Sequence, residues 1–76
     1  MNFPQYRKRF DNKSFYMIIN EKEMEEVQFV GTKKFIYKLN AEKYFEILLI
    51  QSLLTCEDEL YFEITKENYL SVKNTP

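Results

Sequence analysis

The chain has 76 residues, of which 45% are hydrophobic and 30% are charged, and 11 basic and 12 acidic side chains give a formal net charge of −1. This length predicts a single domain over residues 1–76, near the size at which one apolar core is barely sufficient. The small net charge excludes a strong overall attraction to nucleic acid or anionic lipid. A composition without histidine and with one cysteine leaves little for the usual chemistry of active sites.

Two strands are predicted at the start of the chain, over residues 5–10 and 14–20. Between them stand Asp11, Asn12 and Lys13, and Asp and Asn tolerate turn conformations and bind their own backbone. The second segment alternates two apolar sets, Phe15, Met17 and Ile19 against Tyr16 and Ile18. Because successive side chains of a strand point to opposite faces, both faces of this strand are expected to be partly covered.

A β-hairpin is predicted around Gly31, the one glycine of the chain. Glycine reaches positive φ without a steric penalty, so the chain can reverse there and pair residues 24–30 with residues 34–39. The alternation is clearest in the second arm, where one face carries Phe35, Tyr37 and Leu39.

After residue 40 the apolar period changes from strand to helix. A helix is predicted over residues 41–54, with Asn40 as its N-cap. It lacks a glycine to end it and is expected to fray or turn through residues 55–58. A strand over residues 60–64 and a short helix from the cap Thr65 to about residue 72 complete the chain, with residues 73–76 as a loose tail.

These elements define an α+β domain: an antiparallel meander of three or four strands followed by one main helix, a further strand and a short C-terminal helix. The order of the strands in the sheet is left open. The core expected from these elements is Phe15, Met17, Ile19, Val27, Phe29, Phe35, Tyr37, Leu39, Phe45, Leu48, Leu49, Phe62 and Ile64. Replacing Phe35 with Ala is then expected to cost about 3 to 5 kcal/mol.

The main helix suggests a protein interface. Glu42, Lys43 and Glu46 define a polar sector that continues along the helix onto Ile50 and Leu53, so the second half is apolar nearly all round. One explanation is that the C-terminal strand or last helix covers it. The functional alternative places Ile50, Leu53 and Leu54 in the interface of a homodimer.

A basic and aromatic cluster suggests a different function. It comprises Tyr6, Arg7 and Arg9 of the first strand, with Lys34 and Lys38 of the fourth. Basic side chains can track phosphates while aromatic rings stack on unpaired bases, which would allow binding of single-stranded nucleic acid. The sequence pI of about 5.4 and the ordinary use of Lys on half-buried strands speak against it.

No catalytic, cofactor or metal residue is predicted, and the chain is not expected to be an enzyme. Cys56 has no histidine to activate it. Glu57, Asp58 and Glu59 lack the spaced ligands and glycine of a calcium loop, and the adjacent Glu25 and Glu26 should face opposite sides of a strand. The single cysteine and the absence of a signal-peptide stretch favour the cytoplasm.

Several short strings near the start resemble a known group of proteins. They are residues 3–8 (FPQYRK), 12–16 (NKSFY) and 25–28 (EEVQ), together with Gly31. This part of the chain is similar to a group of small uncharacterised proteins from Bacteroidetes bacteria that has no assigned function. The resemblance implies a bacterial, cytoplasmic protein and transfers no site residue.

The function expected from the sequence is therefore a non-enzymatic protein-interaction module, a homodimer without a cofactor. Binding of single-stranded nucleic acid is the alternative, and a role as accessory subunit of a larger complex is a third possibility. The sequence does not identify the partner.

Overall fold

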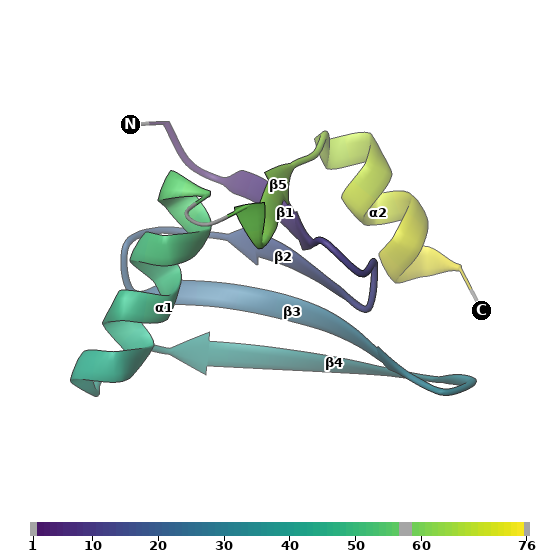
Figure 1. The fold of residues 1–76 in the computed structure, drawn as a ribbon, viewed down its shortest axis with the longest axis horizontal. Coiled ribbons are helices and arrows are strands. Elements are labelled where there is room, and N and C mark those ends of the chain that lie inside the picture. Colours follow the sequence, from purple (N-terminus) through teal and green to yellow (C-terminus); the bar gives the residue numbers. More distant parts are fainter. Residues whose placement is uncertain (1, 57–58, 76) are drawn as a thin grey trace.

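The computed structural model describes residues 2–56 and 59–75, which form a five-stranded antiparallel sheet and two α-helices (Figure 1). The elements in chain order are β1 (Gln5–Arg9), β2 (Ser14–Ile18), β3 (Glu23–Val30), β4 (Lys33–Asn40), α1 (Tyr44–Thr55), β5 (Tyr61–Glu63) and α2 (Lys66–Asn74). The strand order is β4-β3-β2-β1-β5. The α+β class and the meander are confirmed, and the last strand joins the sheet beside β1.

Polar side chains and one glycine form the turns of the meander. The Asp11 carboxylate accepts a hydrogen bond from the backbone N–H of Lys13 at 3.0 Å, and Asn12 between them has φ 59°. Gly31 has φ 61° in the two-residue loop that the Val30–Lys33 pair closes. Both turns lie where the sequence predicts them, because these residue types tolerate the left-handed region.

Helix α1 begins three residues later than predicted. The side chain of Glu46 accepts hydrogen bonds from the backbone N–H groups of Glu42 (3.2 Å) and Lys43 (3.0 Å), which fixes the start of the helix at Tyr44. Asn40 as N-cap is therefore wrong: it is the last residue of β4 and pairs with Glu23. A carboxylate that reaches back from the third helical residue thus binds the backbone N–H groups just before the helix, as in a capping box.

The end of α1 and the start of α2 are each fixed by a local hydrogen bond. Cys56 ends α1 in the left-handed conformation, with φ 54° and its N–H bound to the carbonyl of Ser52. Of the turn expected after it, residues 57 and 58 lie outside the described part of the chain. In α2, Thr65 is the N-cap as predicted, its hydroxyl accepting from the N–H of Asn68 at 3.0 Å. The helix continues to Asn74, past the expected end.

The two helices pack on opposite faces of the sheet. Tyr16 and Ile18 of β2 belong to a core cluster with Ile50 and Leu53 of α1. Phe15, the neighbour of Tyr16 along β2, packs instead against Tyr69 of α2. Because adjacent strand residues face opposite sides, the sheet has an α1 face and an α2 face, each with its own small core.

The predicted core is only partly correct. Phe15 and Val27 are buried, and Met17, Phe29, Leu39, Leu49 and Ile64 pack around the two clusters. The exposed members are Ile19, Phe35, Tyr37, Phe45, Leu48 and Phe62. The buried hydrophobic residues missing from the predicted core are Tyr16, Ile18, Met24, Ala41, Ile50, Leu53 and Tyr69. The reason is that the core is divided between both faces of the central strands, whereas β4 lies at an edge and α1 covers only one end of it (Figure 1).

Candidate interaction surface

Two of the residues predicted for a dimer interface lie inside the subunit. Ile50 and Leu53 have 0% exposed surface, and Leu54 is partly buried against the same cluster. Because α1 starts at Tyr44, Glu42 and Lys43 precede the helix and do not mark its solvent side. The side of the helix that continues from Glu46 to Ile50 and Leu53 instead faces the sheet. The prediction that the side chains of Ile50 and Leu53 are available to a partner is corrected.

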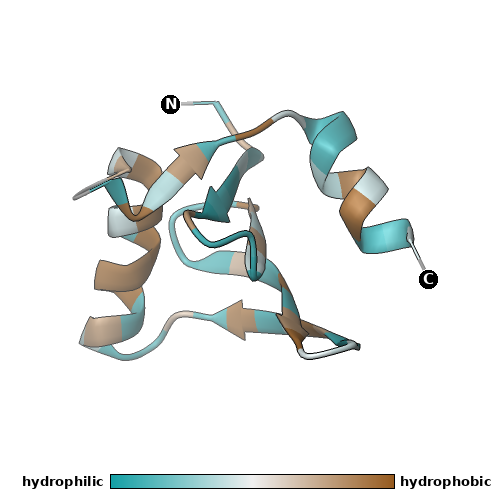
Figure 2. Ribbon diagram, turned by 45° about the vertical axis from the view of Figure 1, so that its right-hand side comes forward, coloured by the Kyte–Doolittle hydropathy of each residue, from teal (hydrophilic) through white to brown (hydrophobic). Residues whose placement is uncertain are grey.

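The exposed apolar side chains of α1 lie in its first half. Tyr44 is 76% exposed, Phe45 66% and Leu48 41%. Farther along, the helix presents the polar Gln51 and Thr55 to solvent. Figure 2 shows the contrast between α1, which is brown along most of its length, and the more hydrophilic α2. The sequence predicted an uncovered apolar surface on the second half of the helix, whereas the structure places the exposed apolar side chains on its first half.

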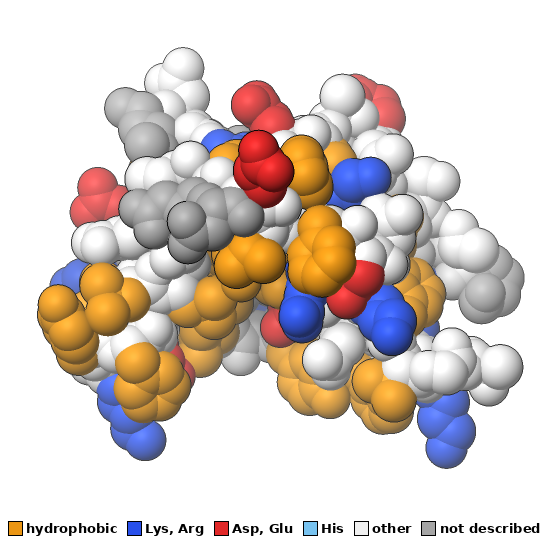
Figure 3. Space-filling model, viewed as in Figure 1, with side chains coloured by type: hydrophobic (Ala, Val, Ile, Leu, Met, Phe, Trp, Pro, Cys, Tyr) orange, Lys and Arg blue, Asp and Glu red, His pale blue; other side chains and the backbone are white. Residues whose placement is uncertain are grey.

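The edge strand β4 carries exposed aromatic side chains on the same face. Phe35 and Tyr37 pair with Gln28 and Glu26, which places them on the α1 face of the sheet. Their rings stack, with centroids 6.2 Å apart and planes at 21°, and both are exposed. Figure 3 shows orange side chains over the lower part of α1 and along the lower margin of this face. We call the set Phe35, Tyr37, Tyr44, Phe45 and Leu48 the α1–β4 surface.

The outer edge of β4 has backbone groups without a strand to pair with in the described structure. Its pairing with β3 is continuous from Glu23–Asn40 to Val30–Lys33, with no bulge. In a two-residue hairpin the closing pair is hydrogen-bonded and every second pair after it is too. The bond from the N–H of Ala41 to the carbonyl of Lys22 continues this parity. The N–H and C=O groups of Lys34, Ile36, Lys38 and Asn40 therefore point away from the sheet.

Arg7, predicted for nucleic-acid binding, has a structural role. It is 5% exposed, and its Nε donates to the carbonyl of Leu53 at 3.0 Å and its Nη2 to that of Leu54 at 3.3 Å. These are carbonyls of the last turn of α1, where a positive charge is favoured. Its neighbour Tyr6 points to the other face and packs against Tyr69, with ring centroids 5.5 Å apart.

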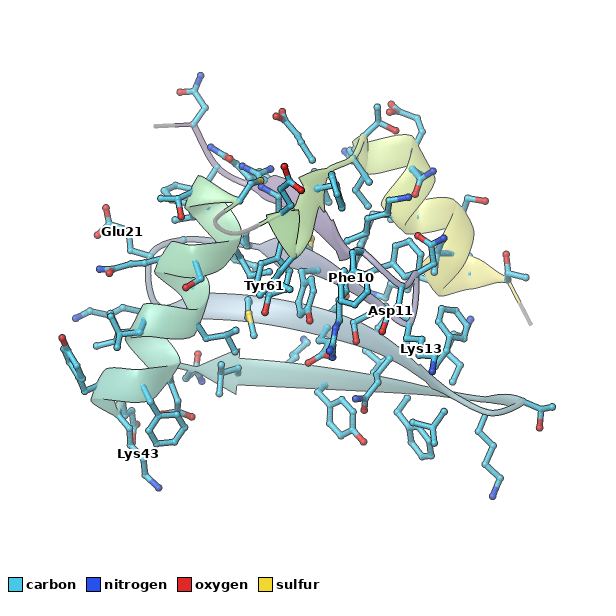
Figure 4. All side chains as sticks on the ribbon, viewed as in Figure 1. Phe10, Asp11, Lys13, Glu21, Lys43 and Tyr61 are labelled. Atoms are coloured by element: carbon cyan, nitrogen blue, oxygen red, sulfur yellow. The ribbon has the colours of Figure 1, made fainter. Side chains whose placement is uncertain are left out.

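The remaining basic residues of the predicted cluster are divided as well. Arg9 is exposed on the α1 face, 3.6 Å from Asp11 and 5.6 Å from the Phe10 ring. Figure 4 shows Phe10 and Asp11 on the side of the sheet that carries Tyr61. Lys34 is on the α2 face, where its Nζ donates to the carbonyls of Val72 (3.3 Å) and Lys73 (2.6 Å) at the end of α2.

The fifth residue, Lys38, is also on the α2 face, opposite Glu25. Arg7 and Arg9 thus lie on one face of the sheet, and Tyr6, Lys34 and Lys38 lie on the other. The structure does not bring the five into one surface.

A buried polar cluster that the sequence did not reveal fixes α2 to the sheet. The Tyr69 hydroxyl donates to Glu25 Oε1 at 2.8 Å, and Lys73 Nζ lies 2.7 Å from the same oxygen. Burial alone would raise the pKa of Glu25, but the hydrogen bonds from Lys73 and Tyr69 outweigh it and hold the pKa below its usual value. Burial and the nearby Glu25 raise the pKa of Tyr69. The sequence feature that could have revealed this cluster is the four-residue spacing of Tyr69 and Lys73, which puts them on one side of α2.

The remaining candidates for chemistry stay apart. Cys56 is half-buried at the end of α1, and Glu25 and Glu26 face opposite sides of β3, as predicted. Over residues 2–56 and 59–75, no three His, Cys, Asp or Glu side chains gather as a metal site would require. Glu57 and Asp58 lie outside that part of the chain. Neither of the helices found there has the length and apolarity needed to cross a membrane.

These features define the class of the protein as a small α+β domain with an antiparallel sheet, a helix on each face and an exposed apolar surface at one edge. Comparison of the chain with protein-family models, with curated proteins and with solved structures found no match.

Proposed function

We propose that the protein is a non-enzymatic protein-interaction module that forms a homodimer through the α1–β4 surface. The observation that carries the proposal is the exposure, on one face of the sheet, of Tyr44, Phe45 and Leu48 of α1 and of the stacked rings of Phe35 and Tyr37 of β4. Large apolar side chains gathered on one face of a small domain usually mark a contact with another protein. The proposed interface thus moves from the buried side of α1 to its exposed first half.

The chemistry of the described residues supports a binding role. In the clearest cluster of titratable groups, the Glu25 carboxylate and the Tyr69 hydroxyl are closed off, since Glu25 is 3% exposed and Tyr69 0%. Lys73 is partly exposed, but its Nζ lies 2.7 Å from the Glu25 carboxylate. The side chains of this cluster bind one another between α2 and the sheet. A group that no substrate can reach acts on stability, so the exposed surface is the better candidate for function.

Sedimentation of the wild type and of two glutamate variants tests the proposal. At high micromolar concentration the wild type is expected to sediment as a dimer. Leu48→Glu places a charge among the exposed apolar side chains of α1 and is expected to weaken the dimer at least about tenfold. Gln51→Glu adds the same charge on the exposed polar part of the helix, and is the matched control expected to dimerise like the wild type.

Two outcomes would contradict the proposal. One is a wild type that remains a folded monomer throughout the concentration range. The other is equal weakening by Leu48→Glu and Gln51→Glu, which would mean that net charge and not the apolar surface controls association. Leu53→Glu is unsuitable for this test, because Leu53 is buried and a charge there would unfold the domain.

Binding of single-stranded nucleic acid stays a prediction from the sequence, as do the cytoplasmic location and the bacterial origin. If the protein binds single-stranded nucleic acid, its affinity should fall steeply with added salt, because counterions are released from the phosphates on binding. A titration of a labelled oligonucleotide at low and high salt tests it. Co-purification from the native cell would separate a homodimer from an accessory subunit of a larger complex.

A further inference from the structure

We propose that the second copy adds its β4 antiparallel to the first β4, with the two-fold axis at Tyr37, so that two five-stranded sheets become one continuous sheet of ten strands. This proposal rests on the homodimer proposed above and specifies its geometry. The partner is another copy of this chain, and the contact consists of backbone hydrogen bonds along the edge with side-chain pairs on both faces.

The edge of β4 offers a backbone template of suitable length. The outward N–H and C=O groups belong to Lys34, Ile36, Lys38 and Asn40, at alternate positions of an eight-residue strand without a bulge. The other edge strand, β5, has three residues. Long, regular edges with apolar side chains are the ones that pair with further strands.

The lysines of β4 would normally protect such an edge, but one of them is already engaged. The ammonium group of Lys34 is turned back over the α2 face and bound to the carbonyls of Val72 and Lys73. Lys38 lies on the same face opposite Glu25, whose carboxylate offsets its charge. The repulsion of an approaching copy is therefore weakened at Lys34 and Lys38, the two lysines of β4 whose backbone groups point outward.

The register follows from the outward groups and the lysines. In the combined sheet, the α1 faces of the two copies lie on the same side. A residue whose N–H and C=O groups point outward must then lie opposite another such residue, because only these pairs can form hydrogen bonds between the two strands. A pair centred on Ile36 sets Lys34 opposite Lys38, and one centred on Lys38 sets that lysine opposite itself, which is unfavourable. Centring on Lys34 or Phe35 leaves some outward groups without strand partners.

Centring on Tyr37 satisfies all of these conditions. Ile36 then opposes Lys38, and Lys34 opposes Asn40, so the four outward residues pair with one another and no two lysines are opposite. On the α1 face Tyr37 meets its own copy and Phe35 meets Leu39. Aromatic and aliphatic pairs of this kind stabilise neighbouring strands, and they cover rings that are 39% (Phe35) and 49% (Tyr37) exposed in the single subunit.

Cysteine cross-linking tests the register. In a background with Cys56→Ser, Tyr37→Cys is expected to form an intermolecular disulfide under mild oxidation. The two copies of position 37 would form a pair that is not hydrogen-bonded, with Cα atoms about 4.5 Å apart, which a disulfide can span. Phe35→Cys is the matched control on the same face: position 35 would lie about 14 Å from its own copy and should remain reduced.

A proline substitution tests the backbone pairing. The N–H of Ile36 points outward, so Ile36→Pro removes a bond to the second copy without removing one to β3, and proline is tolerated on a free edge. Sedimentation should show a dimer weakened about tenfold or more, while circular dichroism remains that of the wild type. Ile36→Thr, which keeps the N–H and suits a strand, should dimerise at least about tenfold more tightly than Ile36→Pro.

The outcomes separate this proposal from the one on which it rests. If Leu48→Glu abolishes the dimer while a folded Ile36→Pro dimerises like the wild type, the homodimer stands and the strand pairing is wrong. Efficient cross-linking of Phe35→Cys, or none of Tyr37→Cys in a dimeric sample, overturns the register. A monomeric wild type overturns both proposals.

Discussion

At the scale of single residues, two basic side chains of the sheet hold the ends of the two helices. Arg7 of β1 binds the last carbonyls of α1, and Lys34 of β4 binds those of α2. Unpaired carbonyls and the negative end of the helix dipole gather at these helix ends. Each cation therefore joins a helix to the face of the sheet on which it packs, in addition to the apolar contacts.

Arg7→Met should strongly destabilise the domain. It keeps much of the apolar stem but leaves the carbonyls of Leu53 and Leu54 without their buried donor, which should cost about 2 to 3 kcal/mol. Urea unfolding followed by circular dichroism measures the loss. Arg9→Met removes an exposed arginine of the same strand and should cost less than about 1 kcal/mol. Equal losses in the two variants would show that Arg7 has no special role.

The buried carboxylate of Glu25 should make the stability sensitive to acid. Its pKa is lowered in the folded state, so its contribution is present at pH values above the ordinary 4.5 and is lost as the pH falls through the folded-state value. Thermal unfolding from pH 7 to pH 3 should show this loss. In Glu25→Gln, a smaller decline over the same range is expected, and an unchanged decline would assign the acid sensitivity to other groups.

At the scale of elements, the β3–β4 hairpin depends on the backbone of one residue. Gly31 has φ 61°, and no atom lies within 4 Å of where a Cβ would stand. Gly31→Ala should therefore destabilise the domain only through backbone strain, by about 1 to 2 kcal/mol. Gly31→Asn should cost less, because Asn tolerates this conformation. Urea midpoints of the two variants compare them directly, and a larger loss in Gly31→Asn would contradict this account.

Local signals were sufficient to predict the elements, whereas their packing depended on contacts distant in sequence. The turns at Asp11 and Gly31 and the cap at Thr65 depend on neighbouring residues, and all three are confirmed. The face of α1 that is buried depends on where the helix starts, and Glu46 sets that start from within the helix. The roles of Arg7 and Lys34 depend on partners 38 to 47 residues away.

The position of Phe35 shows why the candidate site was also misjudged. Alternation predicts a buried residue, but alternation alone does not reveal that β4 is an edge strand, nor how much of it α1 covers. Phe35 is 39% exposed, so the cost of Phe35→Ala should be well below the 3 to 5 kcal/mol typical of a buried ring. The same exposure moves Phe35 from the expected core to the proposed interface.

At the scale of the whole molecule, the sheet separates two small cores, and its two edges differ. Tyr16 and Phe15 are adjacent in β2, yet they contact different helices. Each core is small, so large side chains remain outside both, at β4 and on the first half of α1. The proposed dimer would cover these exposed side chains at the long edge strand β4, while the short strand β5 forms the opposite edge of the sheet.

The place of β5 beside β1 also has a consequence for biosynthesis. Strand β1 borders β2 on one side, but its other neighbour, β5, is encoded only after α1, at Tyr61–Glu63. Until that late stretch emerges, the nascent meander exposes β1 as well as β4 to chance aggregation. During translation, the β1 edge of the sheet is therefore covered only when the stretch that forms β5 has been made.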